Sequence, residues 1–280
     1  SLDGNDDLIE IIEWDGRDIG NIKHLVEACK LISNKMNGHI DKEDIVLVHS
    51  YKELLAGDLL KEKYGCRLAY MLHNPPYGFL CSKIGLRQNW INYRGFAAEK
   101  YTFWKHFIDK VDIFFTNTKW VADLYRKYEK IPAIPIYGGS EHLLSLNTTK
   151  IDLNDPFILC VGAFEPRKRQ HLLVRAMKHL PEAKLVIVGF TRGLRSERYY
   201  KFVKKQIEVL NLSDRVKIVT DCSDNDLVGY YKSCMFLVHP AYYEHMGFTP
   251  MEALSFGKPV IAQNNGGTPE ILRNGRDSLL

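Results

Sequence analysis

The sequence contains no run of about 18 apolar residues, the length that a membrane-spanning helix needs. Its first ten residues, SLDGNDDLIE, do not have the pattern of a signal peptide. Lysine and arginine exceed aspartate and glutamate by only 38 − 34 = 4, whereas nucleic-acid-binding proteins usually carry dense basic clusters. These absences argue against a membrane-spanning protein and against a nucleic-acid partner.

Two glycine motifs of nucleotide-binding proteins are also absent. No G-x-G-x-x-G follows a predicted strand and no G-x-x-x-x-G-K-[ST] occurs, so a dinucleotide dehydrogenase or a P-loop NTPase has no direct support. The six cysteines are scattered, without a C-x-x-C pair or a nearby histidine at metal-binding spacing. They are predicted to be reduced, mostly buried thiols of a cytoplasmic protein, and no metal site is predicted.

Short β-branched or aromatic runs alternate with helical patterns along the chain. The runs are IVLV, RLAYML, IFFTN, FILCVG, KLVIVG, VKIV, MFLVHP and PVIA. Helical patterns of apolar residues lie at 21–36, 168–180 and 198–210. Buried strands that alternate with helices of this length form parallel sheets covered on both faces. The sequence therefore predicts an α/β protein.

One polar segment is a candidate domain boundary. Residues 138–155 lack periodicity and contain Gly, Ser, Asn, Asp and Pro. Roughly three recognisable strands precede this segment, and about five follow it. Because 280 residues fit two domains of about 150 residues, we predict domains at 1–150 and 151–280.

The turn after FILCVG carries a group of cations. Pro166, Arg167, Lys168 and Arg169 are expected at the opening turn of a helix, where free N–H groups and the helix dipole favour an anion. Three cations there are electrostatically unfavourable for the helix itself, so a phosphate or diphosphate ligand is one explanation. A solvated basic turn is the alternative.

The turn after MFLVHP carries two glutamates. Thr249 to Glu252 match a capping box with Pro250 at the first helical position, and Gly257 ends the predicted helix. This cap accounts for Glu252 without any ligand, but it leaves Glu244 unexplained. Two carboxylates around such a turn can accept hydrogen bonds from sugar hydroxyls.

The turn after PVIA, QNNGGTPEIL, again has two glycines, and Thr268 is its predicted N-cap. In doubly wound sheets ligands bind beyond the carboxyl ends of the strands. The three turns are therefore expected to lie together at one edge of the sheet.

These segments carry a resemblance to a known family. The stretch EHMGFTPMEALSFGKPVIAQNNGGTPEIL, with its E-x7-E spacing, resembles the signature of the retaining family-4 glycosyltransferases (glycosyltransferase group 1), which have the GT-B fold. GAFEPRKR resembles the phosphate-binding turn of that family, and the resemblance is strongest over 155–280. It implies two Rossmann-like parallel-sheet domains that face a cleft. The first domain is expected to be incomplete, and the chain truncated at both ends relative to the family.

The resemblance also implies roles for individual residues. Glu244 is expected to touch the donor sugar, and His73, at the end of RLAYML, to face that sugar across the cleft; these are the predicted catalytic residues. Lys168 is expected to contact the donor diphosphate and Glu252 the ribose. The other predicted donor-binding residues are Arg167, Arg169, Met246, Gly247, Phe248 and Thr249.

One position departs from the family pattern. The family usually has an arginine beside the glycine of the phosphate turn, and here that place is Ala163. Arg167 or Arg169 is expected to compensate. His49, at the end of the strand IVLV, is interpreted as a structural histidine.

The function that the resemblance implies is retaining transfer of a hexose from a GDP- or UDP-linked donor, without a further cofactor. The Glu-His spelling of the loop is similar to mannosyltransferases, and a glycan or a lipid-linked saccharide is the expected acceptor. A degenerate GT-B module that only binds nucleotide-sugar, and a sugar phosphorylase, are the alternatives.

The segment 81–110 interleaves aromatic and basic side chains. It is a candidate for peripheral contact with the inner face of the membrane or with a lipid-linked acceptor. An ordinary half-buried helix pair is the alternative.

Overall fold

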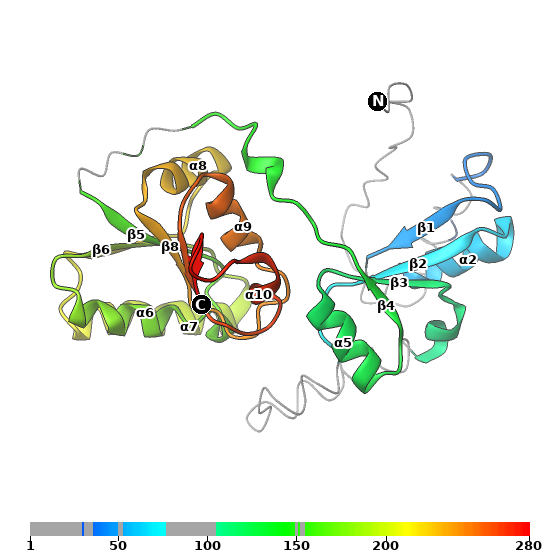
Figure 1. Ribbon diagram of the computed structural model, residues 1–280, viewed down its shortest axis with the longest axis horizontal. Helices are drawn as coiled ribbons and strands as arrows, with labels where there is room; N and C mark the ends of the chain where they lie inside the picture. The colour runs from blue at the N-terminus through cyan, green and yellow to red at the C-terminus, as the bar shows by residue number, and fades with distance from the viewer. Residues whose placement is uncertain (1–29, 31–35, 50–52, 77–104, 149–150, 152–154) are drawn as a thin grey trace. The chain divides into compact units, whose positions relative to one another are not determined.

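The computed structural model describes residues 30, 36–49, 53–76, 105–148, 151 and 155–280. These residues belong to two compact units, one within 1–116 and 125–134 and the other within 117–124 and 135–280. Each unit contains a sheet with helices against it (Figure 1). The predicted α/β class is therefore confirmed.

The first sheet has the strand order β1-β2-β3-β4. Its elements are β1 (Ile45–Val48), α2 (Leu54–Tyr64), β2 (Arg67–Leu72), the 3-10 turn Ile108–Lys110, β3 (Ile113–Thr116), α5 (Lys119–Tyr128) and β4 (Ala133–Pro135). β2 runs parallel to both β1 and β3. His49 and His73 directly follow β1 and β2, so both stand at the carboxyl edge of this sheet.

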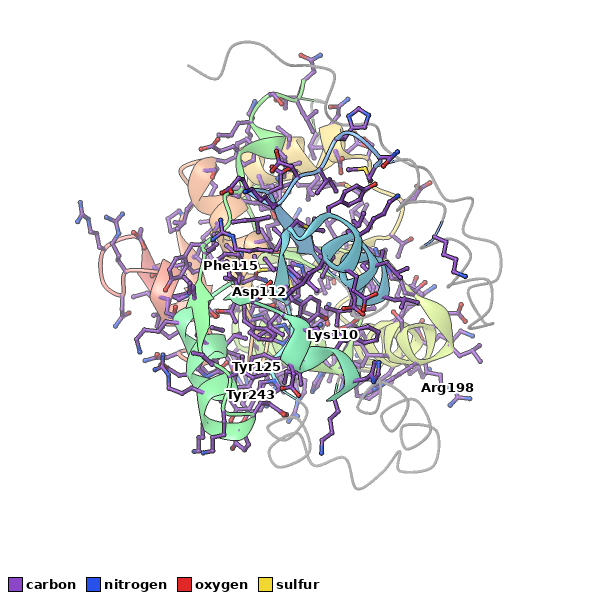
Figure 2. All side chains as sticks on the ribbon, turned by 90° about the vertical axis from the view of Figure 1, so that its right-hand side faces the viewer. Lys110, Asp112, Phe115, Tyr125, Arg198 and Tyr243 are labelled. Carbon is purple, nitrogen blue, oxygen red and sulfur yellow. The ribbon has the colours of Figure 1, made fainter. Side chains whose placement is uncertain are left out.

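Ion pairs connect α2 with the beginning of β3. Lys61 Nζ lies 2.7 Å from Asp112 Oδ1, and Lys110 pairs with Asp58. Asp112 also accepts a hydrogen bond from the Leu68 backbone N–H at 2.8 Å. Figure 2 labels Lys110 and Asp112 in this region.

The second sheet has the order β10-β9-β8-β5-β6-β7, and all of its neighbouring strands are parallel. Its strands are β5 (Phe157–Val161), β6 (Lys184–Val188), β7 (Val216–Val219), β8 (Phe236–His239), β9 (Val260–Ala262) and β10 (Ser278–Leu279). Its α-helices are α6 (Gln170–Ala176), α7 (Gly193–Val209), α8 (Asp224–Ser233), α9 (Phe248–Ser255) and α10 (Thr268–Ile271). Three 3-10 turns accompany them: Glu141–Leu143, Pro166–Lys168 and Met177–His179.

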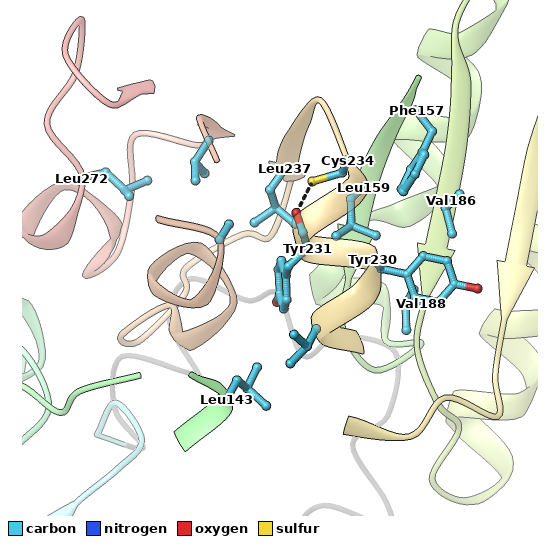
Figure 3. Packing of buried hydrophobic residues seen from close by; sticks show 13 residues of the cluster. Leu143, Phe157, Leu159, Val186, Val188, Tyr230, Tyr231, Cys234, Leu237 and Leu272 are labelled. Carbon is cyan, nitrogen blue, oxygen red and sulfur yellow. Dashed lines mark hydrogen bonds between the residues drawn. The ribbon is translucent and has the colours of Figure 1, made fainter. Parts of the chain in front are cut away.

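Alternate residues of β5 face two separate cores. Phe157 and Leu159 belong to the core under α8 and α9, which Figure 3 shows from close by. Ile158 and Cys160 belong to the core under α6 and α7. This alternation follows from the two-residue period of a strand, and it explains why FILCV is apolar throughout.

Two helices begin earlier than the sequence predicted, α9 by two residues and α10 by one, and both predicted caps are wrong. α9 begins at Phe248 after Gly247, and α10 begins at Thr268 after Gly267. No side chain caps α9, so the predicted capping box of Thr249 is absent. Gly247 has a φ of +89°, a left-handed conformation that glycine adopts without steric cost and that ends the loop ahead of Thr249.

The three cations of the first turn also lie outside the helix that they were expected to open. Arg167 and Lys168 are in the 3-10 turn Pro166–Lys168, and Arg169, with a φ of +54°, is the N-cap of α6. The helical pattern at 198–210 belongs to the longer α7. Two short strands, β4 and β10, were missed because they contain only 3 and 2 residues.

Some predictions fall wholly or mainly outside the described residues, namely the helix at 21–36 and the part of the 81–110 segment up to residue 104. Four cysteines are described, and all four are free: Cys66, Cys160 and Cys234 are buried, and Cys222 is half-buried. None of the helices that the structure describes has the length and apolar character to cross a membrane.

Candidate functional site

The order of the second sheet reverses at the neighbouring strands β5 and β8. From β5 the chain continues outward through β6 and β7, and then returns to place β8 on the other side of β5. α6 packs on one face of the sheet and α9 on the other, as the two cores show. The loops after β5 and β8 therefore diverge toward opposite faces, which is the position where ligands bind in such sheets.

Three donors converge on one oxygen of Glu244 at this position. Glu244 Oε2 lies 2.5 Å from Lys168 Nζ, 3.2 Å from Arg167 Nη1 and 3.1 Å from His239 Nε2. The side chains of Lys168 and Glu244 are only 16% and 11% exposed. A carboxylate buried to this degree needs charged or hydrogen-bonding partners, and the two loops supply them.

These contacts set the protonation states. Burial alone raises the pKa of Glu244, but the hydrogen bond from His239 and the charges of Lys168 and Arg167 hold that pKa well below its usual range. Burial lowers the pKa of His239, although its hydrogen bond to Glu244 opposes the shift. His239 is therefore neutral near pH 7, and its Nε2–H donates to the ionised Glu244.

A buried amide supports the turn that carries Lys168. Gln170 is fully buried, and its Nε2 donates to the carbonyl oxygens of Gly162 at 3.3 Å and Ala163 at 2.9 Å. These bonds connect the beginning of α6 with the end of β5. The backbone of the turn that was predicted to bind phosphate is thereby held in place without an arginine at position 163.

Arg167 and Arg169 have different surroundings. Arg167 shares the Glu244 carboxylate with Lys168. The guanidinium of Arg169 lies 4.1 Å from the ring centroid of Tyr242, and its Nη1 donates to Gln263 Oε1 at 3.3 Å. Of the two residues expected to compensate for Ala163, only Arg167 is beside Lys168 at the carboxylate.

The third turn holds the backbone of the Glu244 loop. The Gly267 N–H donates to the Glu244 carbonyl oxygen at 2.8 Å, and the Tyr243 N–H donates to Asn265 Oδ1 at 2.8 Å. Gly266 has a φ of +67°, and a Cβ there would lie 2.3 Å from the Glu244 carbonyl oxygen. The three turns named in the sequence thus meet at one edge, as expected.

Glu252 lies on α9 and is oriented by α8. Its Oε2 accepts a hydrogen bond from the Tyr231 hydroxyl at 2.6 Å, and its Oε1 lies 3.9 Å from His142 Nε2. The remaining predicted residues lie at the N-terminal end of α9. Met246 is buried, Gly247 is the N-cap, Phe248 is 47% exposed, and Thr249 is half-buried in the first turn.

His73 belongs to the first unit, where it pairs with His49. His73 Nε2 lies 2.9 Å from His49 Nδ1, and the two rings are stacked. Burial, and secondly the neighbouring His49, lower the pKa of His73. The backbone N–H of His49 donates to Glu53 Oε2 at 2.8 Å. His49, which was interpreted as structural, is therefore hydrogen-bonded to His73, which was predicted to be catalytic.

Sequence reasoning missed His239 and Tyr231. His239 had a usable signal, because it ends a strand as His73 does. Tyr231 had none, since an aromatic residue in an amphipathic helix is an ordinary core residue. Within the described part of the chain, no group of three or more His, Cys, Asp and Glu side chains could hold a metal ion.

Two sequence comparisons relate the chain to glycosyltransferases. The family model "Glycosyl transferases group 1" matches residues 145–280. An uncharacterized glycosyltransferase of Methanocaldococcus jannaschii is 28% identical over 262 residues, which cover 92% of this chain and 66% of that protein.

Two solved structures have the same fold. Sucrose-phosphate synthase from Thermosynechococcus elongatus has a TM-score of 0.69 at 20% identity, with 92% of this chain and 66% of that chain covered. The Anabaena protein HepE in complex with UDP and glucose has a TM-score of 0.68 at 19% identity, with 91% and 66% covered. The chain spans just under two thirds of the length of these proteins. The two parallel sheets are thus those of a GT-B fold, and residues 145–280 match the glycosyl transferases group 1 family.

Proposed function

We propose that the whole protein transfers a hexose from a nucleoside diphosphate sugar to a hydroxyl group of a saccharide or lipid-linked acceptor, with retention at the anomeric carbon. The observation that carries this proposal is the pair of cations, Lys168 and Arg167, beside the buried carboxylate of Glu244 at the strand-order switch. A donor diphosphate is an anion that can replace Glu244 as the partner of both cations.

The proposed chemistry follows from this charge arrangement. The bond between the anomeric carbon and the diphosphate oxygen breaks through an oxocarbenium-like transition state, and Lys168 and Arg167 stabilise the negative charge that develops on the leaving diphosphate. The acceptor oxygen attacks from the same face, and its proton passes to the departing phosphate. Every bond and proton is then accounted for without a covalent enzyme intermediate.

The two glutamates have separate proposed roles. When the diphosphate replaces Glu244 as the partner of the cations, Glu244 accepts hydrogen bonds from hydroxyls of the donor sugar. His239 keeps the Glu244 carboxylate oriented. Glu252, held by Tyr231, accepts from the ribose hydroxyls. His73 is proposed to contact the donor sugar from the first unit, with His49 fixing its ring.

The proposed base and sugar follow from the comparison with a solved structure and from the sequence of the Glu244 loop. The likeness to a HepE structure that contains UDP and glucose favours UDP as the nucleotide. Mannose, and with it GDP, rests on the Glu-His spelling at Glu244 and His245. Retention rests on the E-x7-E spacing of Glu244 and Glu252.

Calorimetric titration of the chain with UDP, GDP and ADP tests the proposal. We expect one nucleotide to bind, and Lys168→Met to weaken its binding at least about 10-fold, because a charge-assisted contact is lost. Lys184→Met is the matched control, since Lys184 pairs with the exposed Asp155 on the surface.

A product assay with the matching sugar donor completes the test. Consumption of the donor with acceptor glycosylation is expected, and Lys168→Met should slow it about 10²-fold. Nucleotide binding without donor consumption would favour the binding module, and phosphate-dependent turnover would favour the phosphorylase. Absence of nucleotide binding would reject the proposed site.

A further inference from the structure

Helix α7 has a basic and apolar surface on the side that faces away from the sheet. Its buried residues, Ser196, Tyr199, Val203 and Ile207, define the side that packs on the core. With about 3.6 residues per turn, the opposite side carries seven exposed residues, which we call the α7 surface: Leu194, Arg198, Lys201, Phe202, Lys205, Glu208 and Val209. Figure 2 shows Arg198 extending away from the ribbon.

The apolar residues of the α7 surface are unusually accessible. Leu194 is 72% exposed, Val209 64% and Phe202 46%. Exposed apolar residues that occur singly are normal on a protein surface. Here three of them lie along the exposed side of a single helix and alternate with arginine and lysine, whose charges attract an anionic surface.

Most of the net charge of the chain resides on this helix. α7 contains five basic residues, Arg195, Arg198, Lys201, Lys204 and Lys205, and two acidic residues, Glu197 and Glu208, so its net charge is 5 − 2 = +3. The formal charge of the whole chain is only +4. Lys205 Nζ lies 3.4 Å from Glu208 Oε2, but both side chains are exposed, so this pair is weak.

The basic surface extends toward α6. Arg175 of α6 lines a cavity of about 200 Å³ together with Phe202, Lys205 and Val209. α6 also exposes one large apolar side chain, that of Leu172, at 38%. The apolar and basic groups of the α7 surface therefore continue onto a second helix at the same face of the sheet.

We propose that the α7 surface binds an anionic lipid bilayer, with α7 parallel to the membrane plane. Lysine and arginine side chains reach lipid phosphates while their aliphatic stems lie on apolar surface, and Leu194, Phe202 and Val209 enter the headgroup–acyl boundary. A protein partner requires a continuous apolar centre with a polar rim, whereas here Arg198, Lys201 and Lys205 separate the apolar side chains along the helix. This inference goes beyond the proposed function and does not depend on it.

Co-sedimentation of the 280-residue chain with lipid vesicles tests the proposal. We expect binding to vesicles of phosphatidylcholine mixed with phosphatidylglycerol, and much weaker binding to phosphatidylcholine alone. Each basic residue near an anionic surface contributes about 1 kcal/mol, so Arg198→Glu with Lys205→Glu should reduce the partition at least about 25-fold. Lys217→Glu with Arg276→Glu changes the net charge equally at exposed positions outside α7, and should retain most of the binding.

A second variant separates apolar insertion into the bilayer from attraction by charge alone. Leu194→Gln with Val209→Gln leaves the charge unchanged and removes two apolar contacts, so vesicle binding should fall about 10-fold or more. Equal binding to both lipid compositions, or binding to neither, overturns the proposal. Loss of vesicle binding in the charge-reversed variant but not in the glutamine variant also overturns it, because it shows attraction by charge alone, without entry of Leu194 and Val209 into the bilayer. Circular dichroism of each variant verifies that the fold is retained.

Discussion

Replacement of Lys168 by methionine should destabilise the second unit, because it leaves Glu244 without its shortest charge contact. The variant keeps most of the side-chain volume and removes the ammonium group 2.5 Å from Glu244 Oε2. Removing one partner of a buried ion pair costs about 3–5 kcal/mol. Arg167 and His239 remain at the same oxygen, so we expect a loss of about 2 kcal/mol in the free energy of unfolding.

The control for this prediction is Lys184→Met. Lys184 pairs with Asp155, but these side chains are 45% and 57% exposed, whereas those of Lys168 and Glu244 are 16% and 11% exposed. Exposed pairs contribute about 0–1 kcal/mol. Urea unfolding at pH 7, followed by far-ultraviolet circular dichroism, should therefore distinguish the two methionine variants.

The pH dependence gives the same prediction an independent test. The pKa of Glu244 in the folded protein lies below its unfolded value of about 4.3. Its ionised form therefore contributes stability that is present above that pH and is lost as the pH falls through the folded pKa. In Lys168→Met the folded pKa moves up toward the unfolded value, so the variant should gain less stability than the wild type between about pH 3 and pH 6.

The double variant Lys168→Met with Glu244→Gln completes the cycle. The sum of the losses in unfolding free energy for the single variants Lys168→Met and Glu244→Gln should exceed the loss of the double variant by at least about 1 kcal/mol. Mutational effects at two residues in contact are not additive. Additive losses, or parallel pH curves for Lys168→Met and the wild type, would refute the reasoning that Lys168 holds the Glu244 carboxylate in its ionised state.

Two further predictions concern the loop backbone and the first unit. Gly266→Ala places a Cβ 2.3 Å from the Glu244 carbonyl oxygen, so melting temperature and nucleotide affinity should both fall. Gly275→Ala, at a φ of +77° in open space, should cost only the backbone strain of about 1–2 kcal/mol and leave nucleotide binding unchanged; equal effects of the two alanines would contradict the contact. The pKa of His73 is lowered by burial and secondly by His49, so His49→Gln should move that pKa upward toward its ordinary value. NMR titration of the imidazole resonances measures this shift, and an unchanged His73 pKa would show that burial alone is responsible.

The strands could be predicted from the sequence because burial on two faces leaves a local mark. FILCV is apolar throughout since Phe157 and Leu159 enter one core while Ile158 and Cys160 enter the other. The carboxyl ends of such strands were then the natural places to search for ligand-binding residues. The turns of Lys168 and Glu244 follow two such strands, and they meet in the structure.

Local conformation limited the prediction of the caps. Thr249 and Thr268 have the residue type of an N-cap, but Gly247 and Gly267 occupy the cap positions. The preceding glycine decides where the loop ends, and its dihedral angles depend on contacts from elsewhere. For Gly267 this contact is the hydrogen bond to the Glu244 carbonyl oxygen, across 23 residues of loop and helix.

The sequence by itself determined the α/β class, the positions of the main strands and the three turns that carry the candidate site. Only the tertiary structure decided the partners within that site. Lys168 and Glu244 are 76 residues apart in the chain, and they meet because β8 returns to pair with β5 after two outward strands. The same pairing brings His239 against Glu244. Strand order depends on how whole helices pack over both faces of the sheet, so residue patterns along one segment do not specify it.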